Sequence, residues 1–176
     1  IYLGGGTVTI KGGEISGNTA AENGGGAYLG GGELTVDGGT VSSNSAKNGG
    51  GAFVEGGQVL VFSGKIENNT AEINGGGFDI NNGNFGMTGG FVNKNEAKTG
   101  SGGGIYVSAD DANVVVDVLS GSVSNNKAAE NGGALAVVGD KESEDEITVT
   151  IGVSELHYDA ETNQKIPKKF INPQFT

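Results

Sequence analysis

The chain has 176 residues, including 36 Gly, 2 Pro and no Cys, and its net charge is −11 with ten lysines and no arginine. The lack of cysteine excludes disulfides and thiolate chemistry. The negative charge argues against nucleic acid as a partner, because nucleic-acid binding normally uses a basic face. No apolar run reaches the roughly 18 residues that cross a bilayer, so direct membrane insertion of this segment is not expected.

Glycine triplets recur along the chain at a nearly constant interval. They begin at Gly24, Gly49, Gly75 and Gly102, and Gly132 continues the series, with spacings of 25, 26, 27 and 30 residues. A second marker, an Asn three residues after an aliphatic residue, keeps the same period and phase. Two markers in phase define a repeat of about 25 residues. The chain opens within a repeat, so we expect further repeats before its first residue.

Each repeat contains three short segments in which apolar residues alternate with other residues, and this pattern predicts strands. The first strand, for example 27–29, has apolar outer positions and a central residue that is expected to point outward. The second, for example 34–36, directs two apolar side chains inward. The third is short and carries an aliphatic series: Ile15, Val41, Ile66, Val92 and Val123.

Three short strands cannot bury a core alone, but parallel stacking of successive repeats closes one. We therefore predict an all-β fold, a right-handed parallel β-helix (solenoid) with about six levels over residues 1–153. The alternative is a chain of hairpins at the Asn-Gly dipeptides. We disfavour it because a meander would not need the same residue type at the same place in every repeat.

The asparagines of the second marker predict a structural ladder inside the solenoid. Identical amides stacked at strand spacing can hydrogen-bond along the column. The alternative is a set of solvent-facing turn residues in the left-handed conformation. The predicted ladder consists of Asn18, Asn44, Asn69, Asn95 and Asn126.

The repeat pattern stops after Val153. We expect residues 154–176 to form a C-terminal cap or the start of a next segment, with a hairpin that pairs 156–158 with Ile166. A cap is expected because an open solenoid end exposes strand edges and core. The single histidine, His157, lies in this segment and is not expected to be catalytic.

The same motifs carry a family resemblance. The element Ile15-Ser16-Gly17-Asn18, followed by Gly25-Gly26-Ala27, resembles the paired tetrapeptide repeats of chlamydial polymorphic membrane proteins. It is also similar to adhesin-like repeat proteins of gut bacteria and archaea. The resemblance covers about residues 1–153 and implies a surface-exposed right-handed β-helix, often an adhesin, with no catalytic residues to transfer.

The outward position of the first strand predicts a ligand-binding stripe. Exposed aromatic rings suit sugar rings or a protein partner. The alternative is cross-strand packing that stabilises the sheet, and Asp79 interrupts the stripe. The predicted ligand-binding residues are Tyr2, Tyr28, Phe53 and Tyr106.

The connection between the first and second strands lengthens in the last two repeats and becomes acidic. Crowded carboxylates could hold Ca²⁺, which takes oxygen ligands. The spacing matches neither an EF-hand nor the nonapeptide calcium repeat, and a solvated acidic loop is the simpler interpretation. No other cofactor or metal is expected. The predicted ridge comprises Asp110, Asp111, Asp140, Glu142, Glu144, Asp145 and Glu146.

We therefore predict a non-enzymatic, cell-surface or secreted (extracellular) module that mediates adhesion or ligand display to a host or cell-surface glycan or protein. Two alternatives remain open. One is a polysaccharide lyase or hydrolase of β-helix fold, although fold alone does not carry function. The other is a structural stalk or filament subunit that associates end to end.

Overall fold

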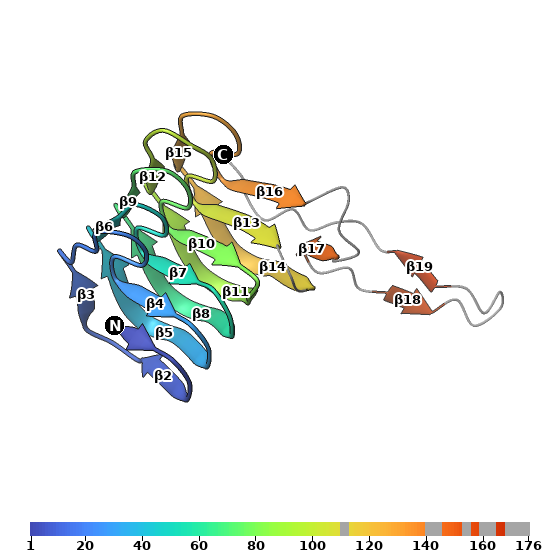
Figure 1. The fold of residues 1–176 in the computed structure, drawn as a ribbon. Helices are drawn as coiled ribbons and strands as arrows, with labels where there is room; N and C mark the ends of the chain where they lie inside the picture. Colours follow the sequence, from blue (N-terminus) through green and yellow to red (C-terminus); the bar gives the residue numbers. More distant parts are fainter. Residues whose placement is uncertain (110–112, 140–145, 153–155, 159–164, 168–176) are drawn as a thin grey trace.

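A computed structural model describes residues 1–109, 113–139, 146–152, 156–158 and 165–167. Its secondary structure consists of strands (Figure 1). Across these described ranges, no helix is long and apolar enough to cross a membrane.

The strands of the repeats, β1 to β17, form three parallel sheets that run along the stack of coils (Figure 1). The first sheet contains β1 (Tyr2–Leu3), β4 (Ala27–Leu29), β7 (Ala52–Val54), β10 (Phe78–Asn81), β13 (Ile105–Ala109) and β16 (Leu135–Gly139). The second contains β2 (Thr7–Ile10), β3 (Glu14–Ser16), β5 (Glu33–Ser42), β8 (Gln58–Glu67), β11 (Asn84–Asn93), β14 (Val114–Ser124) and β17 (Ile147–Ile151). The third contains β6 (Ser45–Ala46), β9 (Thr70–Ala71), β12 (Glu96–Ala97) and β15 (Lys127–Ala128).

Equivalent residues of successive repeats lie directly above one another. In the first sheet, Asp79 pairs with Phe53 on one side and with Tyr106 on the other. The coils have about 26 residues and make about five turns. The predicted parallel β-helix is therefore confirmed, and the hairpin alternative is wrong for the repeat region.

The predicted boundary between the second and third strands is wrong. In the complete coils these two segments form one long strand, such as β5, with register shifts between Val36 and Asp37 and between Asp37 and Thr40. Gly38 has a φ of 113°, a conformation that glycine adopts without a steric penalty. The glycine pair thus bends the strand without ending it, and the third sheet is made by the short alanine-containing strands.

The core lies between the sheets and consists of the predicted inward-facing residues. Leu34 and Val36 of one coil, and Phe85 and Met87 two coils further along the chain, are fully buried. Phe85 also packs against Phe78 of the first sheet, with ring centroids 5.0 Å apart. These contacts close the space between the first and second sheets.

The C-terminal hairpin pairs as predicted. β18 (Leu156–Tyr158) and β19 (Lys165–Pro167) are antiparallel, and His157 is in register with Ile166. The role of this hairpin as a cap stays a prediction.

Candidate functional site

The structure brings the five residues of the predicted asparagine ladder into one column at a corner of the coil, which we call the inner column. Each Nδ2 donates to the Oδ1 of the next asparagine, at 2.9 Å from Asn18 to Asn44, 3.1 Å from Asn44 to Asn69 and 3.0 Å from Asn69 to Asn95. The last link joins Asn95 to Asn126 at 3.0 Å. Asn44, Asn69 and Asn95 are buried.

Every hydrogen-bonding position of the Asn69 side chain is occupied. Its Nδ2 donates to the carbonyl oxygen of Val41 and to Asn95, and its Oδ1 accepts both the backbone N–H and the Nδ2 of Asn44. Two donors and two acceptor positions are the capacity of an amide side chain. The residue before Asn69, Asn68, takes the left-handed conformation at φ 57°. The left-handed turn therefore precedes the inner column and does not include it.

The predicted aromatic stripe forms a stacked column on the outward side of the first sheet. Tyr2, Tyr28 and Phe53 stack with ring centroids 5.6 Å apart and interplanar angles of 8° and 16°. Both ring faces of Tyr28 are therefore covered by Tyr2 and Phe53. This arrangement is the cross-strand packing that was the alternative to ligand binding. Tyr2 is 76 % exposed, whereas Phe53 is only 7 % exposed, so the expectation of a continuously exposed stripe is wrong at Phe53.

The Tyr28 hydroxyl donates a hydrogen bond to Glu55. This bond, together with burial and the negative charge of Glu55, raises the pKa of Tyr28 to about 12. The phenol therefore stays protonated, and keeps its donor, over the physiological pH range.

Asp79 occupies the next position of the same column and is only 4 % exposed. Burial raises the pKa of its carboxyl from 3.8 to about 7, because removal from water disfavours the charged form. In the part of the chain that the structure describes, no group donates a hydrogen bond to this carboxylate or forms an ion pair with it. Sequence reasoning treated Asp79 only as an interruption, since alternation gives a side chain's direction and not its burial.

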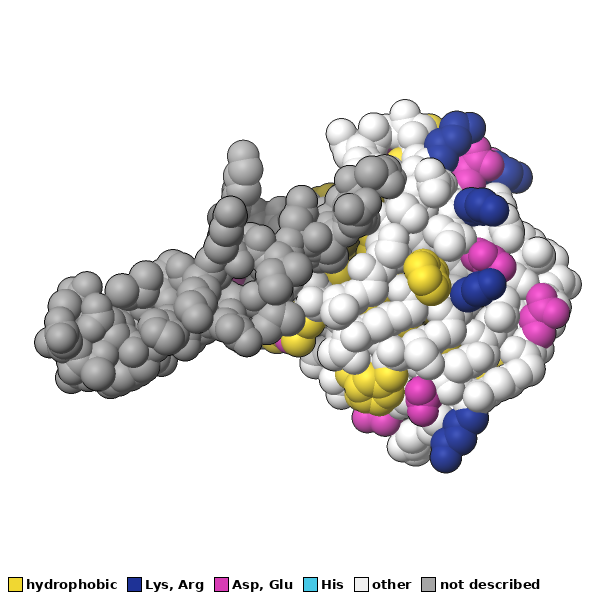
Figure 2. Space-filling view, turned by 180° about the vertical axis from the view of Figure 1, so that it is seen from behind, with side chains coloured by type: hydrophobic (Ala, Val, Ile, Leu, Met, Phe, Trp, Pro, Cys, Tyr) yellow, Lys and Arg dark blue, Asp and Glu magenta, His cyan; other side chains and the backbone are white. Residues whose placement is uncertain are grey.

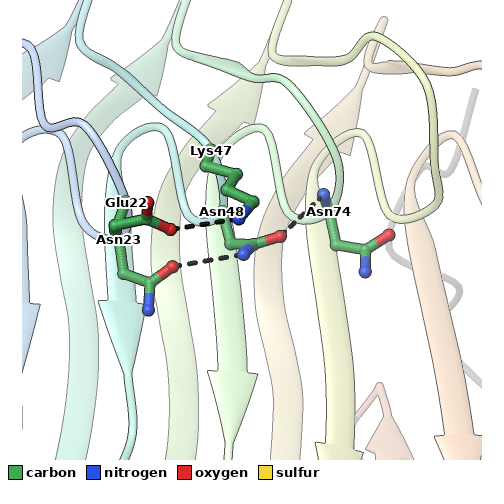
Figure 3. Close-up of polar contacts among 5 residues, drawn as sticks. All are labelled: Glu22, Asn23, Lys47, Asn48 and Asn74. Carbon is green, nitrogen blue, oxygen red and sulfur yellow. Dashed lines mark hydrogen bonds and ion pairs between the residues drawn. The ribbon is translucent and has the colours of Figure 1, made fainter.

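A second asparagine column, which we call the outer column, lies beside the first sheet (Figure 3). Asn48 Nδ2 donates to Asn23 Oδ1 at 3.1 Å, and the backbone N–H of Asn74 donates to Asn48 Oδ1 at 3.3 Å. Ser101 continues the series, with its N–H 2.9 Å from Asn74 Oδ1. The period of the Asn-Gly dipeptides is the sequence signal for this column, although each dipeptide taken alone is typical of a hairpin turn.

The outer column is half-buried and carries an ion pair at its edge. Lys47 and Glu22 of adjacent coils approach to 3.1 Å, as Figure 3 shows. Both side chains are largely exposed, so this pair contributes little to stability.

The outer column and the outward side of the first sheet border an open cavity of about 500 Å³. Phe53, Asp79 and Tyr106 line it from three successive coils, Asn48 and Asn74 line it from the outer column, and Ser108 follows Tyr106 along β13. The volume lies within the usual range for small-ligand sites. Of the four predicted ligand-binding residues, the structure places Phe53 and Tyr106 here. Tyr2 and Tyr28 border a smaller neighbouring hollow with Glu22 and Asn23, and Asn23 also lines the cavity.

The predicted acidic ridge lies almost entirely outside the described residues. Only Glu146 is described, and its backbone N–H donates to Asn113 Oδ1 at 2.8 Å. Within the described ranges, no group of three or more His, Cys, Asp or Glu side chains is placed to hold a metal ion.

Comparison of the chain with protein-family models, with curated proteins and with solved structures found no match to any of them.

Proposed function

We propose that this chain is a non-catalytic, ligand-binding segment of a cell-surface or secreted protein, and that it acts in adhesion or ligand display. The observation that carries the proposal is the cavity in which Asp79, Tyr106 and the outer column meet. Convergence of polar groups in a concave site is a general feature of ligand-binding sites. The repeat motifs, which resemble those of bacterial surface proteins, support the extracellular location.

The face opposite the first sheet provides an internal comparison. Figure 2 shows the molecule from behind, with hydrophobic side chains in separate small areas and charges of both signs between them. Phe62 and Phe91 are about half exposed on the second sheet, away from the cavity. Scattered exposed apolar residues of this kind need no functional explanation. We therefore assign binding to the first sheet.

Array binding tests this assignment. Labelled protein would be applied to arrays of cell-surface glycans and of extracellular proteins, and the partner is expected among them. Tyr106→Ala should reduce binding at least about tenfold, as expected for loss of an aromatic contact in a cavity. Phe91→Ala, which removes an exposed ring from the other face, should bind as the unchanged protein does. Equal losses in both variants, or no binding by the unchanged protein, would contradict the proposal.

Asp79 favours one alternative, an enzyme acting on polysaccharide. A carboxyl group with a pKa of about 7 suits a general acid. Hydrolysis of glycosidic bonds ordinarily needs a second carboxyl group, and Asp79 is the only one among the described residues that line the cavity. Release of reducing or unsaturated sugar ends, lost in Asp79→Asn, would support the enzyme and overturn the non-catalytic proposal.

A further inference from the structure

Asp79 is a buried acid that has no hydrogen-bond or ion-pair partner among the residues that the structure describes. Its side chain lies in register between Phe53 and Tyr106, at 4 % exposure, without a described partner. Burial of an unpaired carboxylate costs free energy, and no lysine is among the described residues that line the cavity. A group that remains unfavourable in the free protein is a natural place for a ligand to supply the missing charge.

The other polar groups of the cavity can accept further hydrogen bonds. Asn48 Oδ1 and Asn74 Oδ1 each accept one backbone N–H from the next coil, and an amide oxygen has a second lone pair. The Ser108 hydroxyl lies on the same lining. The cavity therefore offers several acceptors around one carboxylate, which suits a ligand with several N–H donors on one atom.

The aromatic residues favour a cation over a sugar ring. Stacking of a sugar needs an open ring face, but Phe53 stacks on Tyr28 and is only 7 % exposed. A small cation is attracted to the face of an aromatic ring when water is excluded, and Asp79 follows Phe53 in the column on the side away from Tyr28. The net charge of −11 also draws cations toward the protein.

We propose that the cavity centred on Asp79 binds a primary alkylammonium group, which forms an ion pair with the Asp79 carboxylate beside Phe53 and Tyr106. The inference rests on the proposed function, because it names the ligand chemistry of the same site. Two sources supply this group: a lysine side chain of a protein partner and a free polyamine.

Calorimetric titration of the folded protein tests the assignment. The probes are a lysine-containing peptide, the same peptide with its lysine acetylated, spermidine, and a methyl glycoside. The lysine peptide or spermidine should bind at pH 8, whereas the acetylated peptide and the glycoside should not. Stronger binding of the peptide identifies a protein partner as the source, and stronger binding of spermidine identifies a polyamine.

Two variants separate the site from general attraction to an acidic protein. Asp79→Asn should weaken amine binding at least about tenfold, since one partner of a desolvated charge pair is lost. Asp37→Asn removes the same charge from an exposed position on β5 and should leave binding unchanged. Equal affinities of Asp79→Asn and the unchanged protein would overturn the inference. Circular dichroism would confirm that both variants are folded.

The pH dependence gives an independent readout. Asp79 and the Tyr106 phenol are the titratable groups among the described residues that line the cavity, and Phe53 on the other neighbouring strand carries no charge. Amine binding should strengthen about tenfold from pH 6 to pH 8, as the carboxyl with a pKa of about 7 ionises. The lack of this change would overturn the inference.

The experiments distinguish an error in the ammonium site from an error in the proposed function. If the array ligand depends on Tyr106 but neither amine binds, ligand display stands and the ammonium site is wrong. If the glycoside binds in place of the amines, the same cavity is a sugar site and the inference is overturned.

Discussion

The inner and outer columns repeat the same side chain at nearly the same interval, and yet their surroundings differ. In the inner column, Asn69 is fully buried and each of its amide hydrogen-bonding positions is filled. In the outer column, Asn48 is half-buried, makes one side-chain pair at 3.1 Å and accepts one longer bond at 3.3 Å. The outer column also borders a cavity, whereas the three middle asparagines of the inner column are buried within the coil.

We interpret this difference as a division of roles, in which the inner column stabilises the fold and the outer column is available for binding. An amide with every position satisfied inside the protein has no capacity left for a ligand, and its loss leaves buried groups unpaired. An amide at the edge of a cavity can exchange water for a ligand at little cost to the fold. Under the proposed function, the repeat would use one residue type for two purposes, and burial would decide between them.

A large loss of stability is expected from a substitution that crowds the inner column without removing an amide. In Gly51→Ala the new Cβ would lie 2.5 Å from the carbonyl oxygen of Gly77 and 3.2 Å from Asn69 Nδ2. Because the first contact is with backbone of the next coil, we expect a loss of about 3 kcal/mol or more in the free energy of unfolding. Urea denaturation measures it. Gly12→Ala, with no atom within 4 Å of its Cβ, is the control and should be nearly neutral.

Next in size is the effect of Asp79, beside the outer column, on the pH dependence of stability. Well below pH 3.8 the carboxyl is protonated in both the folded and the unfolded state. As pH rises toward 7 the unfolded chain loses this proton while the folded protein keeps it, so the free energy of unfolding falls. The rise in the pKa from 3.8 to about 7 corresponds to a loss of at most about 4 kcal/mol, complete above pH 7.

Asp79→Asn should remove this loss, so its stability relative to the unchanged protein should increase between pH 5 and pH 8. Urea denaturation at the two pH values measures the change, and Asp37→Asn controls for the net charge. If both variants show the same pH dependence, the Asp79 carboxyl is not desolvated, and the outer column does not border a buried charge.

The smallest expected effect concerns the turn that leads into the inner column. Ser43 precedes Asn44 with a φ of 55° and is exposed. A side chain in this conformation costs free energy that glycine avoids, so Ser43→Gly should stabilise the protein by roughly 0.5 to 1 kcal/mol. Ser16→Gly, at an exposed strand position, should instead destabilise it. The midpoint of thermal unfolding would reveal both signs, and a lower midpoint for Ser43→Gly would contradict the assigned turn.

The fold could be predicted from the sequence because its determinants are periodic. The glycine triplets and the inner asparagines specify parallel stacking whatever the details of each coil. The long strand β5 could not be divided correctly, because the Asp37-Gly38-Gly39 segment can either end a strand or bend it, and the neighbouring coil decides. Strand alternation likewise predicts that the Asp79 side chain lies on the outward side of the sheet. It does not predict the burial of this side chain, which depends on the other residues that line the cavity.

The outer column was missed for a related reason. Asn48-Gly49 is a common turn dipeptide, so its sequence neighbours predict a turn. Stacking is indicated only by the recurrence of the same amide once per coil. Residues that act through stacking are recognised by comparing equivalent positions between repeats, and not by their immediate neighbours in the sequence.

The most direct test of the difference between the columns is the free energy of unfolding of Asn69→Leu measured beside Asn48→Leu. Both substitutions exchange an amide for an apolar group of similar size, in successive coils. We expect a loss of about 3 to 5 kcal/mol for Asn69→Leu, because several buried groups lose their partners, and less than about 1 kcal/mol for Asn48→Leu, where water replaces the amide. Equal losses in the two variants would contradict the separation of a structural inner column from an outer column available for binding.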